Sequence, residues 1–396
     1  MDDSKKPEVH KGLVGVYVDD SKVSKIVQET NSLTYRGYAV QDLCANCKFE
    51  EVAFLMWNGE LPTKQELADF EKKERSLRAI EPELVDVLKK LRHDAHPMDV
   101  LRTAISFIGA QDPNWADESK AANLEKSVSM MAKLPTIVAA WSRIRNGEEP
   151  IAPRTDLSYS ENFFNMTTGK VPEPEIISAF DKTMILYAEH SFNVSTFTAR
   201  TITSSLSDIY SAVTGAIGSL KGRLHGGANE AVLDVIQEIG EPEKAQAWLD
   251  DAIAKKKTIM GFGHRVYKSG DSRVPTLKGA FNDVVKLKGG EKIGQIMDIL
   301  EEGMLQKKNI KPNVDFPTAG LYHLMGIEKD LYTPLFVMAR ITGWTAHVME
   351  QLEGNKLIRP LCTYSGEVQR PVVPMDQRGK APQATPAQKK PGNPAP

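Results

Sequence analysis

The chain has 396 residues, of which 41% are hydrophobic, and this apolar content is enough for a large core. The length exceeds the roughly 250–300 residues that a single hydrophobic core usually organises. Its 50 basic and 52 acidic side chains nearly cancel, which argues against nucleic-acid binding. Three cysteines are too few for a secreted disulfide framework, the mixed-charge amino terminus does not resemble a signal peptide, and no apolar run reaches the ~18 residues of a membrane span. We expect a cytoplasmic protein with two domains, or one large body with a lobe, and a cleft between them.

A minor β element is predicted near the amino terminus. The β-branched run at residues 14–18 and the turn-like residues 35–38 indicate one or two small hairpins within residues 12–40. Cys44 and Cys47 follow with the spacing of half a zinc site or a redox pair. No second pair follows and no βαβ pattern surrounds them, so we interpret this spacing as coincidence.

Helix dominates the rest of the chain, so the predicted fold class is all-α. Thr63, with Glu66 three residues later, has the pattern of a helix start. Proline and glycine between Gly147 and Pro174 predict a long surface connection, and the region from Pro174 to Leu220 is apolar enough to be buried helix. Apolar residues at three- and four-residue spacing predict helices at 49–57, 82–91, 98–108 and 123–145.

The proline-rich tail from about Gln377 to Pro396 has a composition that cannot bury enough apolar surface to stay ordered. No period of 20–50 residues recurs, so a repeat architecture is not supported.

Four loops in the second half of the chain each place one proton-handling side chain beside glycine, proline or asparagine. Such residues fix turns and helix ends, which is where sites are commonly built. The side chains are those of His190, His225, His264 and Asp315. A lone histidine elsewhere in a helical protein is usually structural, and we expect a backbone partner for the other histidines: His10, His93, His96, His323 and His347.

His225 precedes two glycines that lead into an apolar-periodic helix, beside the positive end of its dipole. A neutral imidazole is favoured there and could donate a hydrogen bond to a developing enolate. His264 follows Gly261 and Gly263, whose backbone can approach a ligand closely. The run lacks the third glycine of a dinucleotide fingerprint. The lysines at 255–257 are either a solvated helix face or a docking place for ligand phosphates.

Asp315 lies in an extended approach to a helix expected to start near Thr318. Taken alone it fits an N-cap aspartate, and beside two loop histidines it also fits a general base. Three arginines either pack on the surface and between helices or hold carboxylates with their planar, two-pronged guanidinium groups. They are Arg273, Arg340 and Arg359.

These motifs closely resemble the signature loops of the citrate synthase family. They read LHGGANE at 224–230, GFGHRVYK at 261–268 with DSR at 271–273, and NVDF at 313–316, in family order and at family spacing. The resemblance runs from KGL at 11–13 to LIRPL at 357–361. Within the family, YAEHSFNVSTFTAR at 187–200 and ITGWTAH at 341–347 look most like the bacterial 2-methylcitrate synthase branch.

The resemblance implies a helical homodimer that condenses an acyl-CoA, propionyl-CoA and often acetyl-CoA in this branch, with oxaloacetate. Its large domain would span 1–226 and 327–376, its small domain 227–326. No cofactor or metal is implied beyond the two substrates. Asp315 would remove the α-proton, His225 would hydrogen-bond the thioester oxygen, and His264 would polarise the ketone. The remaining roles are oxaloacetate binding by His190, Arg273 and Arg340, a reach into the neighbouring site by Arg359, and CoA binding by Thr258, Ile259, Met260, Gly261, Phe262 and Lys268.

Two alternatives stay open at this point. A metal-dependent hydrolase would gather the three histidines and Asp315 around an ion, although no compact ligand motif such as H-E-x-x-H is present. A scaffold without catalysis would leave the four loop residues without a role. Two departures from the family are Arg223, where relatives commonly have proline, and the variable stretch at 317–320, which could set the acyl-chain preference.

Overall fold

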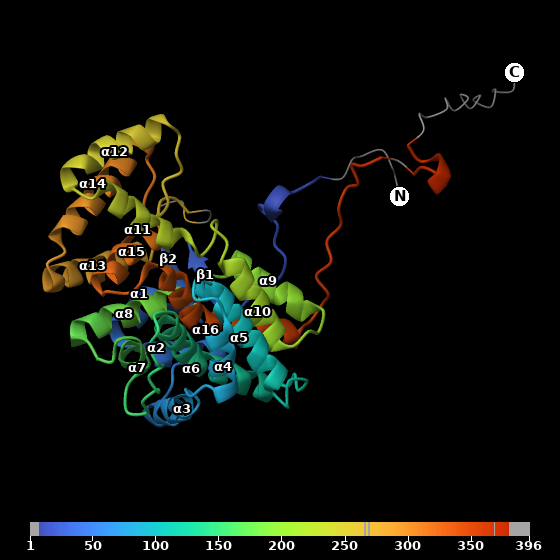
Figure 1. The fold of residues 1–396 in the computed structure, drawn as a ribbon, viewed down its shortest axis with the longest axis horizontal. Coiled ribbons are helices and arrows are strands. Elements are labelled where there is room, and N and C mark those ends of the chain that lie inside the picture. Colours follow the sequence, from blue (N-terminus) through green and yellow to red (C-terminus); the bar gives the residue numbers. More distant parts are fainter. Residues whose placement is uncertain (1–7, 265–266, 268–269, 368, 380–396) are drawn as a thin grey trace, which may run out of the picture. The chain divides into compact units, whose positions relative to one another are not determined.

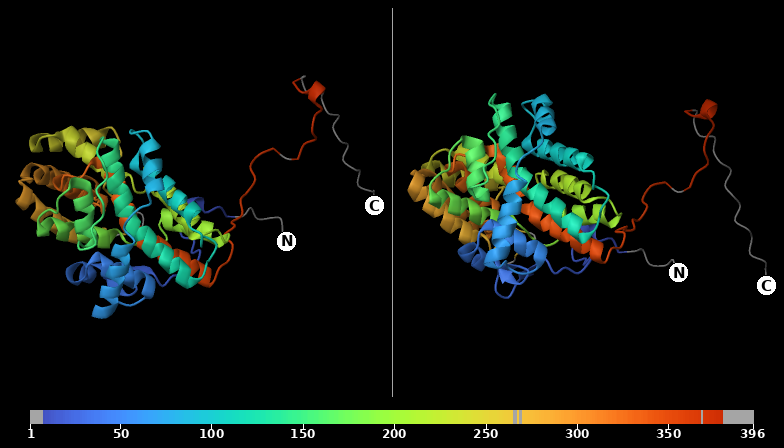
Figure 2. Two further views of the ribbon diagram at one scale, coloured as in Figure 1. Left: turned by 60° about the horizontal axis from the view of Figure 1, so that its bottom comes forward. Right: turned by 90° about the horizontal axis from the view of Figure 1, so that it is seen from below.

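The computed structural model describes residues 8–264, 267, 270–367 and 369–379. These residues form sixteen α-helices and one small sheet, which confirms the predicted all-α class with a minor β element (Figures 1 and 2). They fall into two units. Asp19–Ile358 contains every α-helix and strand, and the other unit, residues 8–18 with the described part of 359–379, contains only two short 3-10 helices. Within the described ranges, no helix combines the length and the apolar character needed to cross a membrane.

The sheet is a meander of three short antiparallel strands, β1 (Ser24–Val27), β2 (Ser32–Tyr35) and β3 (Tyr38–Ala39), in the order β1-β2-β3. Ile26 lies opposite Leu33, and Tyr35 lies opposite Tyr38. The predicted hairpins are therefore confirmed, but their placement on residues 14–18 was wrong. Those residues are exposed and form no strand, because β-branched side chains favour a strand only where a partner strand and a buried face are available.

Four of the first six helices, α2, α4, α5 and α6, begin and end within about three residues of the predicted positions, whereas the short helix α1 was not predicted. Thr63 caps its helix as expected: the Glu66 carboxylate accepts the Thr63 N–H at 2.8 Å, and the Thr63 hydroxyl accepts the Glu66 N–H at 3.3 Å. This reciprocal pair satisfies two amides that the first helical turn leaves open. The bounds are α1 (Val40–Asn46), α2 (Phe49–Asn58), α3 (Lys64–Ser76), α4 (Pro82–Lys90), α5 (Pro97–Gln111) and α6 (Lys120–Arg145).

The predicted surface connection between Gly147 and Pro174 was wrong in its middle, where α7 (Tyr159–Thr168) forms. Ser158 and Glu161 make a capping box at its start, and Phe163 and Phe164 are buried. The proline clusters on both sides hid a short helix whose own start signal was present.

Buried helices follow as predicted, namely α8 (Pro174–Tyr187), α9 (Val194–Ser204) and α10 (Ile209–Leu220). The long helix α16 (Tyr332–Glu353) packs against α6, α8, α9 and α10, and almost all of its side chains are buried. It thereby forms the centre of the Asp19–Ile358 unit (Figure 1).

The remaining helices pack mainly on one another and gather at one end of this unit, in yellow and orange in Figure 1. They contact the other helices chiefly through α13 on α8 and α11 on α16. Their bounds are α11 (Ala228–Ile239), α12 (Pro242–Ala254), α13 (Val274–Lys288), α14 (Glu291–Lys308) and α15 (Asp315–Leu324). The predicted disordered tail lies, from residue 380 onward, outside the described residues.

Candidate active site

His190 lies in the loop that joins α8 to α9. The loop turns at Ser191, which has a positive φ of 53°, and ends at Asn193, whose side chain accepts the Thr196 N–H and so caps α9. His190 is 7% exposed, and its buried Nε2 has no hydrogen-bond partner. Burial, together with the charge of Arg273, holds the pKa of His190 well below its usual range. A neutral ring with an unsatisfied nitrogen is suited to bind a ligand.

His225 lies three residues before the first residue of α11, as the glycines predicted. Burial, followed by the charge of Arg340, lowers the pKa of His225 to about 3, which favours the neutral imidazole. Backbone hydrogen bonds hold the turn, from His225 N to Gly222 O at 2.8 Å and from Gly226 N to Leu220 O at 2.9 Å. A Cβ on residue 226 would lie 2.6 Å from Leu220 O, so this turn requires glycine.

The proton of the His225 ring can be assigned from its neighbours. The Ser195 N–H lies 3.3 Å from Nε2 and can only donate, so Nε2 is the acceptor and Nδ1 carries the proton. The Ser195 hydroxyl lies 2.8 Å from the same nitrogen and is itself bonded by Trp344 Nε1 at 3.0 Å. These hydrogen bonds fix the ring through Nε2 and leave its Nδ1–H as a donor.

The loops of His264 and Asp315 are joined by an antiparallel bridge between Phe262 and Pro312. Asn313 reinforces the bridge, with its N–H bonded to Gly261 O at 2.9 Å and its Nδ2 to Gly263 O at 3.0 Å. Two loops that lie about fifty residues apart in the sequence are thereby held as one unit.

Asp315 is the first residue of α15, whereas a helix start near Thr318 was expected. Val314 takes the cap position, the Asp315 side chain makes no capping bond, and its Oδ1 is buried without a partner. The N-cap interpretation is therefore wrong. Burial raises the pKa of Asp315 to about 7, against the opposing charge of Arg273. A carboxylate with this pKa can act as a general base near neutral pH.

Arg273 is 3% exposed and is held by Asp271. Its Nε and one terminal nitrogen donate to the two Asp271 oxygens at 2.9 and 2.7 Å, and Asp271 also accepts the Val314 N–H at 3.1 Å. Burial opposes ionisation of Asp271, but the charge and bonds of Arg273 keep the pKa of that carboxyl well below its usual range. This two-pronged pair fixes the guanidinium group and ties it to the Asp315 loop.

Arg340 enters the site from α16. It is 1% exposed, its Nε donates to Tyr187 O at 2.7 Å, and its guanidinium group stacks 4.6 Å from the centre of the Phe336 ring. Burial lowers the pKa of Arg340 to about 10, with Glu189 opposing that shift, so the group remains a cation at neutral pH.

The structure brings six of the predicted residues together. The rings of His190 and His264 have centroids 5.0 Å apart, and Tyr267 packs against both at 5.5 and 4.7 Å. The charge of Arg273 acts on both of these histidines, and the charge of Arg340 acts on His190 and His225. Both arginines act on Asp315.

His264 itself is neutral at physiological pH. Burial, followed by the charge of Arg273, lowers its pKa to about 4. Its Nδ1 accepts the Tyr267 N–H at 3.3 Å, so the proton of the neutral ring lies on Nε2, which becomes a donor.

The other predicted site residues are not among these six. Arg359 is exposed and belongs to the unit of the chain ends, and Lys268 lies outside the described residues. Residues 258–262 form a turn without helix, as a ligand-binding loop would. Gly261 has a φ of 85°, and a Cβ there would lie 2.6 Å from Val232, so close packing also requires this glycine. Arg223, the departure noted above, is exposed.

Sequence reasoning missed several residues that support this site. Asp271 could have been noticed from its spacing, two residues before Arg273. Ser195, Trp344 and Tyr187 carry no local signal, because each acts through a partner distant in the sequence. Tyr267 contacts His264 only three residues away, and that spacing could have been noticed. His347 was expected to have a backbone partner, and its ring instead contacts the side chains of Glu189 and Arg200 at 3.0 and 3.1 Å. Among the described residues, no three His, Cys, Asp or Glu side chains gather in a way that could hold a metal ion.

Comparison with known proteins identifies the class. The family model of the citrate synthase C-terminal domain matches residues 12–361. A citrate synthase of Mycolicibacterium smegmatis is 56% identical over 94% of this chain and 99% of its own. A 2-methylcitrate synthase of Mycobacterium tuberculosis H37Rv is also 56% identical, over 92% of each chain.

Solved structures agree with these relatives. Citrate synthase from Thermoplasma acidophilum, in a ternary complex with carboxymethyl coenzyme A and oxaloacetate, has a TM-score of 0.89 and 32% identity, covering 94% of this chain and 100% of that one. Citrate synthase from Thermotoga maritima has a TM-score of 0.84 and 37% identity, covering 94% and 99%. The chain therefore belongs to the citrate synthase family, a family of acyltransferases.

Proposed function

We propose that this protein is a 2-methylcitrate synthase, which condenses propionyl-CoA with oxaloacetate, hydrolyses the CoA thioester, and also accepts acetyl-CoA. The observation that carries the proposal is a buried carboxylate with a pKa near 7 in one site with three neutral imidazoles and two buried guanidinium groups. This set suits two steps: removal of a weakly acidic proton from the acyl-CoA, and attack of the resulting enolate on the keto group of a dicarboxylate. The two substrates suffice, and the scheme uses no cofactor.

In the first step, Asp315 takes a proton from the α-carbon of the acyl-CoA. Electron density moves onto the thioester oxygen, where the Nδ1–H of His225 stabilises the developing enolate. A neutral donor suits this task, because it leaves no excess charge when the enolate reacts.

In the second step, the α-carbon of the enolate bonds to the keto carbon of oxaloacetate. His264 polarises the ketone through Nε2–H and protonates the new alkoxide. Arg273, Arg340 and His190 hold the dicarboxylate within attack distance. The proton that Asp315 took from the α-carbon replaces the one that His264 gave to the alkoxide. Water then attacks the thioester carbonyl, one of its protons leaves with CoA as the thiol, and the other is released to solvent as the new carboxyl group ionises.

We further propose that a small domain, residues 227–326, closes over a large domain formed by 1–226 and 327–376. Helices α11–α15 lie within the proposed small domain, and their packing on one another supports it. Closure would exclude water until condensation is complete, with oxaloacetate binding first. The turn at residues 258–262 would receive the CoA adenine, and Lys268 a phosphate.

The acyl preference is tested by steady-state kinetics with both thioesters. We expect kcat/KM for propionyl-CoA to exceed that for acetyl-CoA, by up to about a hundredfold, because one methylene contributes about 1–3 kcal/mol in a fitted pocket. CoA release in the presence of saturating oxaloacetate reports the rate. An acetyl-CoA preference of tenfold or more would make the protein a citrate synthase, the name of the M. smegmatis relative, with the same chemistry.

We propose that the active form is a homodimer in which Arg359 reaches the neighbouring site. The unit formed by the chain ends supports a partner, because it leaves large apolar side chains in solvent. The most exposed are Tyr17 at 98%, Leu361 at 87%, Val372 at 85% and Tyr364 at 80%.

Mixing two inactive variants tests the shared site. Arg359→Ala and Asp315→Asn subunits, exchanged at equal amounts, should recover about a quarter of wild-type activity, because half of the dimers are mixed and each holds one intact site. The variants are unfolded and refolded together, and mass spectrometry verifies exchange. Mixed dimers that form without any recovered activity would contradict the shared site.

A further inference from the structure

One face of α16 carries the site residue Arg340 and, at Gly343 and His347, the surface that contacts Glu189, the residue before His190. We call this surface the seat of Glu189. Arg340, Gly343 and His347 follow at spacings of three and four residues and therefore share this face. A Cβ on Gly343 would overlap Glu189 Oε2 and lie 2.5 Å from Ala188 O. Only glycine lets the loop lie this close to the helix.

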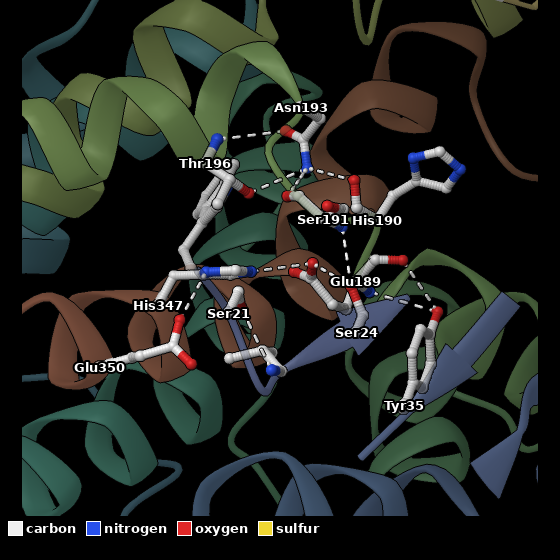
Figure 3. A network of polar contacts seen from close by, with 12 residues as sticks. Ser21, Ser24, Tyr35, Glu189, His190, Ser191, Asn193, Thr196, His347 and Glu350 are labelled. Carbon is white, nitrogen blue, oxygen red and sulfur yellow. Dashed lines mark hydrogen bonds and ion pairs between the residues drawn. The ribbon is translucent and has the colours of Figure 1, made fainter. Parts of the chain in front are cut away.

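The Glu189 carboxylate is fully buried in that seat (Figure 3). Its Oε1 accepts from His347 Nε2 at 3.0 Å and from Ser24 Oγ at 2.9 Å. The same Ser24 hydroxyl accepts the Ser191 N–H at 2.9 Å, and the Tyr35 hydroxyl donates to Glu189 O at 3.0 Å. The bonds therefore hold the backbone on both sides of His190, and the His190 ring extends away from them (Figure 3).

His347 is itself fixed from its other side. Arg200, which can only donate, lies 3.1 Å from His347 Nδ1, so Nε2 carries the proton given to Glu189, and Glu350 lies farther from Nδ1 at 3.6 Å. Arg200 also stacks 4.6 Å from the centre of the Phe192 ring, and that ring meets His347 edge-on at 5.6 Å. Arg200, His347 and Glu189 thus form one buried chain of hydrogen bonds from α9 through α16 to the His190 loop.

The Glu189 carboxylate is charged, but its charge does not attract the proposed substrate. Burial opposes its ionisation, but the charges of His347 and Arg340 keep the pKa of Glu189 below its usual range, and Glu189 in turn helps to keep Arg340 a cation. An anion at this place would repel a dicarboxylate substrate, and its buried Oε2 has no hydrogen-bond partner. The arrangement is explained if its contribution is geometric.

We propose that Glu189, seated on Gly343 and His347, is a positioning residue that fixes His190 relative to Arg340 for oxaloacetate binding. This inference rests on the proposed function, and it assigns to Glu189 and His347 no direct contact with substrate. Because α16 carries both Arg340 and the seat, any shift of Glu189 changes the spacing of two oxaloacetate ligands that come from different elements.

The test is His347→Leu, which removes the donor to Glu189, compared with His347→Gln, whose amide can replace it. We expect His347→Leu to raise the oxaloacetate Kd, measured by calorimetry without acyl-CoA, by about tenfold to a hundredfold. The KM for acyl-CoA at saturating oxaloacetate should change less than about threefold. His347→Gln should return the oxaloacetate Kd to within about threefold of wild type.

Thr345→Val is the matched control. It removes the buried hydrogen bond of 2.8 Å that Trp57 Nε1 donates to the Thr345 hydroxyl on the same helix, and it leaves the His190 loop unchanged. If His347→Leu does not fold, Ser24→Ala, which breaks the bridge between Ser191 and Glu189 from half-buried β1, should weaken oxaloacetate binding in the same direction.

The outcomes separate this inference from the function on which it rests. Wild-type protein that binds no oxaloacetate overturns the proposed function. Wild type that binds while His347→Leu or Ser24→Ala binds equally well, or no worse than Thr345→Val, overturns only the role of Glu189. Equal losses in His347→Leu and His347→Gln would also overturn it, because the donor would then be irrelevant.

Discussion

Asp315→Asn is expected to lower kcat by about a thousandfold, since general-base catalysis contributes about 10²–10⁴. Asparagine keeps the shape of the side chain but cannot take the α-proton. The oxaloacetate Kd should stay within about threefold of wild type, because the proposed carboxylate ligands are His190, Arg273 and Arg340. Turnover and calorimetry, measured on the same preparation, check both parts.

The pH dependence of the wild type gives an independent check of the same residue. The pKa of Asp315 is raised to about 7 by burial, so kcat/KM for the acyl-CoA should fall as the pH drops through about 7 and the base becomes protonated. The exposed Asp283 provides a control variant, Asp283→Asn, that should behave as wild type. A rate that is flat between about pH 5 and 8, or Asp315→Asn with more than about a tenth of wild-type activity, would contradict the assignment.

Arg273→Ala is expected to lose both oxaloacetate binding and stability. The substitution removes a proposed carboxylate ligand and leaves the buried Asp271 anion without its partner. Breaking one side of a buried ion pair costs about 3–5 kcal/mol of unfolding free energy, and the oxaloacetate Kd should rise by about a hundredfold or more. Chemical denaturation and calorimetry measure the two effects.

The double variant Arg273→Ala/Asp271→Asn separates these losses. Neutralising Asp271 should restore much of the unfolding free energy, because no unpaired charge remains buried, while oxaloacetate binding should stay weak. If oxaloacetate binding returned with stability, Arg273 would serve only the fold. Wild-type oxaloacetate affinity in Arg273→Ala would show that Arg273 does not bind oxaloacetate.

Part of the site was predictable because its loops obey local rules. Glycines at 226 and 261 mark places where a Cβ would collide with Leu220 and Val232, and His225 precedes the first of these turns while His264 follows the second. Helix starts such as Thr63 were equally legible, since a cap involves only residues three apart. The exceptions, the missed helix α7 and the misplaced strand at 14–18, arose where packing decided between competing local signals.

The sequence by itself therefore determined the helical class, the limits of four helices in the first half of the chain and the identity of the loops that carry His190, His225, His264 and Asp315. Only the tertiary structure decided the protonation states of these groups. The near-neutral pKa of Asp315 and the neutral rings come from desolvation, which depends on everything packed around them. The anchoring of Glu189 joins residues as far apart as Ser24, 165 positions away, and no local pattern encodes such a pair. Periodicity and capping report neighbours along the chain, whereas burial and charge pairing report neighbours in space.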